Sequence, residues 1–308
     1  MQLDIVALGE PLGEFNQTRP GEPDYRFGHG GDTSNVAIAA ARQGAKVGYV
    51  TAVGDDAFGR SFLELWQREG VFVGGVKVDP TAHTGVYFVT HGPDGHEFSY
   101  LRAGSAASRL GPGDLPRDVI AAARLLHVSG ISQAISPAAA DAVFEAMAIA
   151  RAAGATIAYD TNLRLRLWPL ARARAVSGAA MALADIALPG LDDARQLTGL
   201  EQPDAIVDHY LALGCKIVAL TLGKDGSLVA TASERQRIPS ISVAAIDATG
   251  AGDCFDGAFL AEWLRTGDAF AAGRYATVAA ALSTTGWGAV APLPQRAAVE
   301  AALGRGAA

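Results

Sequence analysis

The sequence has 308 residues, of which 50% are hydrophobic and 19% charged, and its formal net charge is −7. This composition argues against intrinsic disorder and predicts one large α/β domain with a sizeable core. The negative charge argues against a nucleic-acid surface and a basic membrane-binding patch, so neither partner is expected. The two cysteines, Cys215 and Cys254, provide no disulfide framework, and the first ten residues lack a signal-peptide pattern. These features predict a cytoplasmic protein.

Short apolar runs that alternate with helical patterns fill most of the chain. Six runs have the length and composition of buried strands: 3–8, 46–51, 125–130, 156–161, 185–189 and 216–222. The clearest helix spans 136–154, with Ser136 as its N-cap, Pro137 in its first turn and Gly154 at its end. The stretch after Gly252 is typical of helices. This alternation predicts a doubly wound fold, a parallel sheet covered by helices on both faces.

Residues 86–102 break this pattern, because apolar and polar residues alternate around the turn sequence GPDG (92–95), as in an antiparallel hairpin. The preceding segment 13–31 is rich in glycine and proline. We expect the two regions to form a small separate β-sheet that acts as a lid. The lid is predicted from about 13–31 and 84–105, within a single domain that covers the whole chain.

The segment IDATGAGDCF (246–255) places glycines directly before an aspartate at the start of an apolar helix. Backbone N–H groups of Gly250, Ala251 and Gly252 are suited to hold an anion there. A carboxylate would repel a bound phosphate unless it takes a proton, so the pattern favours phosphoryl transfer with Asp253 as the general base. The helix N-terminus predicts a lowered pKa for Asp253. The alternative is that Asp253 only caps the helix.

Two other nucleotide-binding motifs that use glycines are not supported by the sequence. The sequence contains no P-loop motif. The glycines before Asp253 occur late in the chain and lack the acidic residue, about twenty positions on, that completes a dinucleotide-binding fingerprint. Phosphoryl transfer therefore remains the favoured chemistry.

Four segments resemble signatures of the ribokinase-like (PfkB) carbohydrate kinase family, in that family's order and spacing. They are GGDTSNVAIAAARQG (30–44), VGDDAFG (53–59), TLGKDGS (221–227) and DATGAGDCF (247–255). The resemblance implies a ribokinase-like α/β domain with a small β-sheet lid over the sugar. It also implies phosphorylation of a sugar hydroxyl by ATP with Mg²⁺, and homodimers that form through the lid.

The same resemblance implies roles for single residues. Asp253 would be the base, and Gly250, Ala251 and Gly252 would form an anion hole. The nucleotide-binding residues would be Thr221, Gly223, Gly226, Gly250 and Gly252, and the sugar-binding residues Gly31, Asp32 and Asn35. Many members bind K⁺ near the residue that matches Asp247, and the need for K⁺ is left open here. For Asn35, a hydrogen bond at the start of its helix is the alternative.

One element departs from the family pattern. Members commonly carry Asn-x-x-Glu before a Leu-Thr-Gly turn, tied to hydrated Mg²⁺, whereas PGLDDARQLTG (189–199) has Gly190 and Asp193 at those positions. Asp193 retains the ability to bind Mg²⁺ through a water, but Gly190 cannot replace an amide side chain. Asp192 is a candidate substitute. The departure leaves open a non-catalytic sugar-binding regulator as an alternative function.

Arginines distinguish the candidate substrates. The period of two along a strand places Phe98, Tyr100 and Arg102 on one face of the hairpin. Arg164 and Arg166 follow a predicted strand, at whose carboxyl end α/β proteins bind ligands. A guanidinium is a good bidentate partner for a carboxylate, and a neutral sugar has no anion for two arginines. In the alternative, Arg164 contacts a nucleotide phosphate and Arg166 is a solvated surface charge.

Further segments resemble one subfamily, the 2-keto-3-deoxygluconate kinases. They are GEPL (9–12), YLRAGSAAS (100–108), HVSGIS (127–132), YDTNLR (159–164) and TTGWGA (284–289). This similarity implies that Tyr87, Tyr100, Arg102 and Arg164 hold an acidic sugar whose terminal hydroxyl is phosphorylated. The inward face of the strand that carries Tyr87 is left open. The nearest alternative is a kinase of a neutral sugar such as fructose, ribose or a nucleoside.

Overall fold

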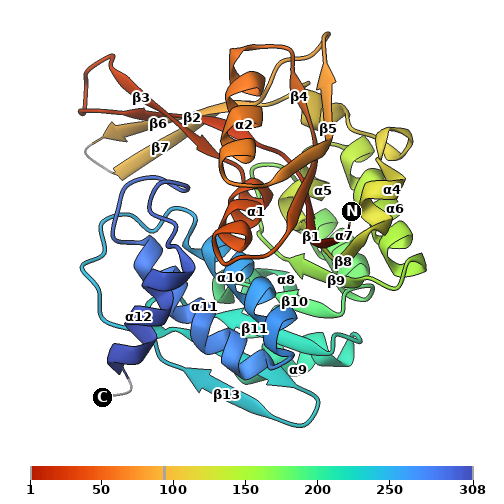
Figure 1. The fold of residues 1–308 in the computed structure, drawn as a ribbon, viewed down its shortest axis with the longest axis vertical. Helices are drawn as coiled ribbons and strands as arrows, with labels where there is room; N and C mark the ends of the chain where they lie inside the picture. Colours follow the sequence, from red (N-terminus) through yellow and green to blue (C-terminus); the bar gives the residue numbers. More distant parts are fainter. Residues whose placement is uncertain (1, 93–94, 307–308) are drawn as a thin grey trace.

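The structure, a computed structural model, describes residues 2–92 and 95–306 and contains one large and one small β-sheet (Figure 1). The large sheet has nine strands. In spatial order they are β13 (Arg235–Ile238), β12 (Ser227–Thr231), β11 (Ile217–Thr221), β10 (Ile186–Leu188), β9 (Thr156–Asp160), β8 (Ala123–Ser129), β1 (Leu3–Leu8), β4 (Val47–Gly54) and β5 (Phe72–Asp79). From β11 to β5 neighbouring strands are parallel, and β12 and β13 form an antiparallel edge. The predicted α/β fold with a mostly parallel sheet is confirmed.

Helices cover both faces of this sheet, which is why its strands are apolar on both sides. One layer consists of α1 (Asp32–Arg42), α2 (Ala57–Arg68), α10 (Ala251–Thr266), α11 (Ala269–Ser283) and α12 (Arg296–Gly306). The other consists of α3 (Ala106–Arg109), α4 (Arg117–Ala121), α6 (Pro137–Ala152), α7 (Leu170–Met181), α8 (Leu191–Thr198) and α9 (Pro203–Ala212). The remaining short elements are α5 (Gly130–Ala134), η1 (Pro112–Asp114) and η2 (Gly223–Asp225).

Alternation along the strands divides the core into two hydrophobic clusters. In β1, Ile5 and Ala7 pack into the cluster beneath α1 and α10, whereas Val6 and Leu8 pack into the opposite one. Helix α6 begins as predicted, because the Ser136 hydroxyl accepts a hydrogen bond of 3.0 Å from the Ala139 N–H. None of the helices in the described part of the chain has the length and apolar character that a membrane span needs.

The small sheet, called the lid here, contains β3 (Tyr25–Gly30), β2 (Leu12–Gln17), β6 (Val86–Gly92) and β7 (Gly95–Leu101) in that spatial order. Strands β6 and β7 form the predicted antiparallel hairpin, and residues 93–94 at its turn lie outside the described residues. The register places Tyr87 opposite Tyr100, with ring centroids 5.7 Å apart. This pairing answers the question of faces, since both rings line the cavity described below.

Helices α1 and α10 come from opposite ends of the chain and lie side by side against the sheet (Figure 1). Gly257 on α10 permits this approach, because a Cβ atom there would lie 2.6 Å from the Val36 carbonyl oxygen.

We expect Gly257→Val to lower the free energy of unfolding by about 3 kcal/mol, since the helices would have to separate. Urea denaturation measures this. Gly178→Ala is the control, because a Cβ at Gly178 meets no atom within 4 Å, and an equal loss there would contradict the account.

Candidate active site

A cavity of about 950 Å³ lies between the lid and the carboxyl ends of the main-sheet strands, where open α/β folds place their ligands. Most residues with predicted roles line it. They are Gly31, Asp32, Asn35, Tyr87, Tyr100, Arg102, Arg164, Asp193, Thr221, Gly250, Ala251, Gly252 and Asp253. Gly223, Gly226 and Asp247 are not among the lining residues. The structure therefore brings the predicted base, anion hole and sugar-binding side chains into one cavity.

The start of α10, where the anion hole was predicted, lines the cavity, but the Ala251 N–H already donates a 3.1 Å hydrogen bond to the Ala248 carbonyl. Gly250 is the N-cap residue with φ of 75°, a left-handed conformation that favours glycine, and no side chain caps the helix. A Cβ atom on Gly250 would also lie 3.1 Å from Ala289. The first-turn N–H groups of Gly252 and Asp253 have no intrahelical acceptors, so they are available to an anion in the cavity.

Asp253 is held by a residue from α1. The Asn35 side-chain amide donates a hydrogen bond of 2.7 Å to the Asp253 carboxylate. The alternative that Asn35 only stabilises the start of its own helix is therefore wrong. Gly31 precedes α1 with φ of 101°, and a Cβ there would lie 2.3 Å from the Glu10 carbonyl oxygen, so the turn itself requires glycine.

Asp32 is buried and accepts hydrogen bonds from the Ser129 hydroxyl and, over 3.2 Å, from the Asn162 side-chain amide. Asp32 Oδ1 and Asn35 Oδ1 are also buried, and neither has a hydrogen-bond partner among the described residues. Unpaired buried acceptors are costly, so these two atoms indicate where the hydroxyl groups of a ligand would donate.

The pKa of Asp253 is raised to about 7, first by burial and then by the charge of Asp32. This is opposite to the lowering expected from the helix N-terminus, whose partial charge is outweighed by desolvation and by neighbouring carboxylates. Burial and mutual repulsion also raise the pKa values of Asp160 and Asp256. Neither residue was predicted from the sequence, although Asp160 lies in a predicted strand segment and Asp256 lies one helical turn after Asp253.

A raised pKa predicts the pH dependence of activity. Asp253 accepts a proton only when it is ionised, and ionisation is lost as pH falls through about 7. We therefore expect kcat/KM to fall about tenfold per pH unit on the acid side of that value. A pH–rate profile from pH 5 to 9 measures this. A profile that stays flat down to pH 5 would contradict the raised pKa.

Arg102 lies just after β7 and is paired with a residue that the sequence analysis did not select. Its Nη2 donates to the fully buried Glu10 carboxylate in an ion pair, and its guanidinium lies 5.6 Å from the Tyr100 ring centroid. Ser105 donates a second hydrogen bond of 2.9 Å to Glu10. Glu10 belongs to the GEPL segment, and its position after the first strand was the available signal.

The turn after β9 brings two further arginines to the cavity. Asn162 is the only described non-glycine residue with positive φ, 25°, and this turn directs the chain across the cavity. Arg164 donates to the Leu163 carbonyl over 2.8 Å and forms no ion pair with a carboxylate in the described part of the chain. Arg166 lines the same cavity, but its side chain is exposed, and its Nη1 donates a 2.9 Å hydrogen bond to the Phe98 carbonyl of the lid.

The elements predicted to hold nucleotide and metal are only partly in the cavity. Thr221 lines it, and Gly190 pairs with Thr221 in an isolated β-bridge. Gly226 has φ of 95°, and a Cβ there would lie 2.0 Å from the Ile238 carbonyl oxygen, so the β11–β12 turn itself requires this glycine. The Asp193 carboxylate accepts a hydrogen bond of 2.8 Å from the Leu163 N–H. Asp192 lies outside the cavity, beside Arg195 and 91% exposed.

Asp247 links the anion-hole loop to the segment after α11. Its carboxylate accepts hydrogen bonds of 2.9 Å and 2.7 Å from the Thr249 N–H and hydroxyl, and one of 2.9 Å from the Gly288 N–H. The Ile246 N–H also donates to the Thr284 carbonyl. These contacts give Asp247 a structural role in positioning the loop that precedes Gly250.

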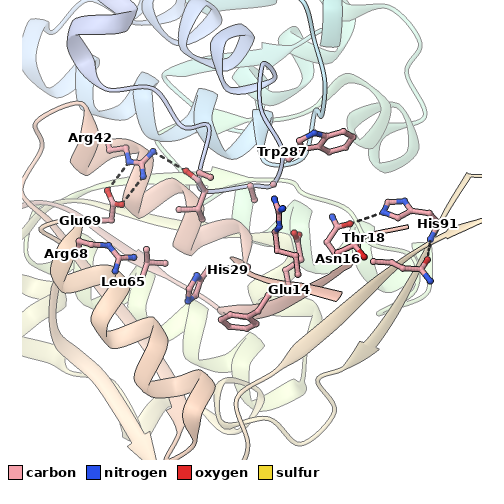
Figure 2. Close-up of a pocket in the computed structure, with 18 residues that line it drawn as sticks. Glu14, Asn16, Thr18, His29, Arg42, Leu65, Arg68, Glu69, His91 and Trp287 are labelled. Carbon is pink, nitrogen blue, oxygen red and sulfur yellow. Dashed lines mark hydrogen bonds and ion pairs between the residues drawn. The ribbon is translucent and has the colours of Figure 1, made fainter. Parts of the chain in front are cut away.

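A second cavity, of about 730 Å³, lies between the lid, helices α1 and α2, and residues 287–291 (Figure 2). Trp287 overhangs it from one side, while Asn16 and His91 approach from the lid. Glu14 lines this second cavity and accepts a hydrogen bond from the hydroxyl of Tyr87, whose side chain lines the first cavity. Tyr87 therefore presents its ring to the first cavity, because its hydroxyl is already bonded.

Comparison with known proteins identifies the family of this chain. The model of the pfkB family carbohydrate kinases matches residues 2–296. The 2-dehydro-3-deoxygluconokinase of Thermoproteus tenax is 36% identical over 91% of this chain and 88% of the relative, and probable fructokinase-4 of Arabidopsis thaliana is 34% identical over 97% and 96%. The fructokinase of Vibrio cholerae O395, in its fructose-, ADP- and calcium-bound form, is 28% identical with a TM-score of 0.86 over 97% and 98% of the chains. This chain belongs to the pfkB family of carbohydrate kinases.

Proposed function

We propose that the protein is a 2-dehydro-3-deoxygluconokinase, which transfers the γ-phosphoryl group of ATP to the terminal hydroxyl of 2-keto-3-deoxygluconate. The observation that carries this proposal is the pair Arg102 and Arg164 in the same cavity as Asp253. Guanidinium groups suit a substrate carboxylate, which neutral sugars lack. The relative from Thermoproteus tenax supports the same substrate.

The residues of the cavity divide the chemistry among them. Asp32 and Asn35 accept hydrogen bonds from the sugar hydroxyls through their unpaired oxygens. The Asp253 carboxylate takes the proton of the terminal hydroxyl as that oxygen bonds to the γ-phosphorus, and the bond to the leaving ADP oxygen breaks. The N–H groups of Gly252 and Asp253 stabilise the charge that develops on the transferred group. Closure of the lid excludes water, which would otherwise compete as acceptor.

ATP and Mg²⁺ are assigned to the part of the cavity that contains Thr221, Gly252 and Asp193. Thr221 and Gly252 would contact ATP, with Gly223 and Gly226 shaping the turn beside it. Mg²⁺ would neutralise phosphate charge when bound. Asp193 fits a role in Mg²⁺ binding. Within the described chain only one of its carboxylate oxygens accepts a hydrogen bond, which comes from the Leu163 N–H. A K⁺ ion beside Asp247 stays a prediction.

A neutral sugar is the second candidate substrate. Glu10 already balances the charge of Arg102, so of the two arginines proposed to bind the carboxylate only Arg164 has no carboxylate partner among the described residues. The identity with probable fructokinase-4 is also close to that with the 2-dehydro-3-deoxygluconokinase of Thermoproteus tenax. Both observations favour fructose as the alternative acceptor.

Release of ADP with Mg²⁺ and ATP tests the proposal. The acceptors are 2-keto-3-deoxygluconate, its galactonate epimer, fructose, ribose and adenosine, and an assay without acceptor measures ATP hydrolysis. We expect kcat/KM to be highest, by about a hundredfold, for the keto-deoxy acids. Faster turnover of fructose would establish the second candidate, and nucleotide binding without turnover of any acceptor would indicate a regulator.

We also propose that copies of the chain pair through the outer face of the lid. Phe15 on that face stacks on Phe88 with ring centroids 5.0 Å apart, and Phe27 beside it is 38% exposed, although Phe58 of α2 packs against part of both rings. Exposed aromatic surface of this kind favours association. Light scattering measures the mass in solution, and a monomer at micromolar concentration would refute the proposal.

A further inference from the structure

Glu10 joins the main sheet to the root of the lid. It follows β1 by two residues, and its side chain is fully buried. Its two partners, Arg102 and Ser105, come from the segment that leaves β7. A Cβ atom on Gly85 would lie 3.0 Å from Glu10 Oε1, so the space between Gly85 and Glu10 accommodates the carboxylate and little more.

The pair determines the orientation of Arg102. Its Nη2 is bonded to Glu10, and the Tyr100 ring lies beside the guanidinium. Its Nε is buried and has no acceptor among the described residues. Nε–H and Nη2–H leave the same edge of a guanidinium, so this edge faces Glu10, and Nη1, which has no hydrogen-bond partner among the described residues, is left to donate to a carboxylate in the cavity.

The ion pair also divides two tasks between the arginines. Because Glu10 neutralises Arg102, this arginine offers oriented donors with little net charge. Arg164 has no carboxylate partner in the described chain and contributes the net positive charge. In this division, Arg102 selects the substrate carboxylate by geometry and Arg164 attracts it by charge.

We propose that Glu10 is a positioning residue for substrate selection: it holds the Arg102 guanidinium in the orientation that accepts the carboxylate of a sugar acid. The identity of that acceptor rests on the proposed function. The groups that face Glu10 are Arg102, Ser105 and, at longer range, the carboxylate of Asp32.

Glu10→Gln keeps the shape of the side chain and removes its charge. We expect it to raise KM for 2-keto-3-deoxygluconate about tenfold, with kcat and the KM for ATP within about twofold of wild type. Arg102→Met alone should raise the same KM at least as much. In the Arg102→Met background, Glu10→Gln should change KM less than about twofold, because the two residues act as one unit.

Two results would overturn the proposal. One is an equal rise in KM from Glu10→Gln in both backgrounds, which would show that Glu10 only supports the lid. The other is an unchanged KM in the single variant. Ser105→Ala is the matched control, since it removes the other hydrogen bond of Glu10 and leaves the ion pair. If Glu10→Gln does not fold, Glu10→Asp keeps the charge on a shorter side chain and should raise KM by an intermediate factor.

An arginine Nε–Hε NMR signal separates this proposal from the proposed function. The Arg102 signal is assigned by its loss in Arg102→Met. Positioning by Glu10 predicts that Glu10→Gln shifts or broadens this signal in the protein without substrate, and an unchanged signal would refute it. A signal that responds to Glu10→Gln but not to added 2-keto-3-deoxygluconate would refute the proposed substrate and leave the positioning role intact.

Discussion

Replacing Asp253 with asparagine is expected to lower kcat about 10³- to 10⁴-fold, because the amide cannot accept the hydroxyl proton. The variant should still bind ATP, since the backbone N–H groups at the start of α10 remain. Steady-state ADP release measures the loss. Asp192→Asn is the matched control, as Asp192 is 91% exposed and lies outside the cavity. A variant that retained a tenth of wild-type kcat would rule out Asp253 as the base.

The same variant should be more stable than wild type above pH 7. Burial raises the pKa of Asp253 to about 7, so ionisation at higher pH costs the folded state and not the unfolded one. Asparagine carries no such cost. After allowance for solvent screening, we expect a gain of about 1–2 kcal/mol at pH 8 that shrinks as pH falls below 7 and disappears only below about pH 4, near the ordinary pKa of an aspartate in the unfolded chain. Lower stability of the variant at pH 8 would contradict the assigned cause of the pKa shift.

Arg164→Met is expected to raise KM for the sugar acid about a hundredfold while the KM for ATP stays within about twofold. Arg164 provides a positive charge that has no carboxylate partner among the described residues, so its removal leaves the substrate carboxylate near carboxylates such as Asp32 and Asp253. Initial rates over a range of sugar concentrations measure this. Arg172→Met, an exposed arginine on α7, is the control. A rise confined to the KM for ATP would instead assign Arg164 to a nucleotide phosphate.

Much of the fold follows from local patterns. Strands such as β1 and β8 are continuous apolar runs, because they are buried between two helix layers. Strand β5 was missed because it is an edge strand, largely exposed, whose sequence FVGGVKVD includes two glycines and a lysine. The antiparallel strands β12 and β13 were also not identified, since β13 is the charged run RQRI at the other edge.

The site was less predictable than the fold, because its properties arise between distant segments. Glu10 and Arg102 are 92 positions apart, so no local pattern reveals their ion pair. The pKa of Asp253 depends on Asp32, which α1 brings to the start of α10. The glycine-rich start of α10 was predictable, because its glycines, helix start and aspartate are contiguous in the chain. Residue types and order indicated a carbohydrate kinase, whereas the raised pKa of Asp253 could be inferred only from the packed structure.

A competition assay tests the central claim most directly. Equal concentrations of 2-keto-3-deoxygluconate and fructose are incubated with limiting ATP and Mg²⁺, and ¹³C and ³¹P NMR identify the phosphorylated product. We expect the phosphoryl group to accumulate on the terminal hydroxyl of the sugar acid, with fructose left unchanged. Accumulation of a fructose phosphate would contradict it and would assign the arginines of the cavity to another task.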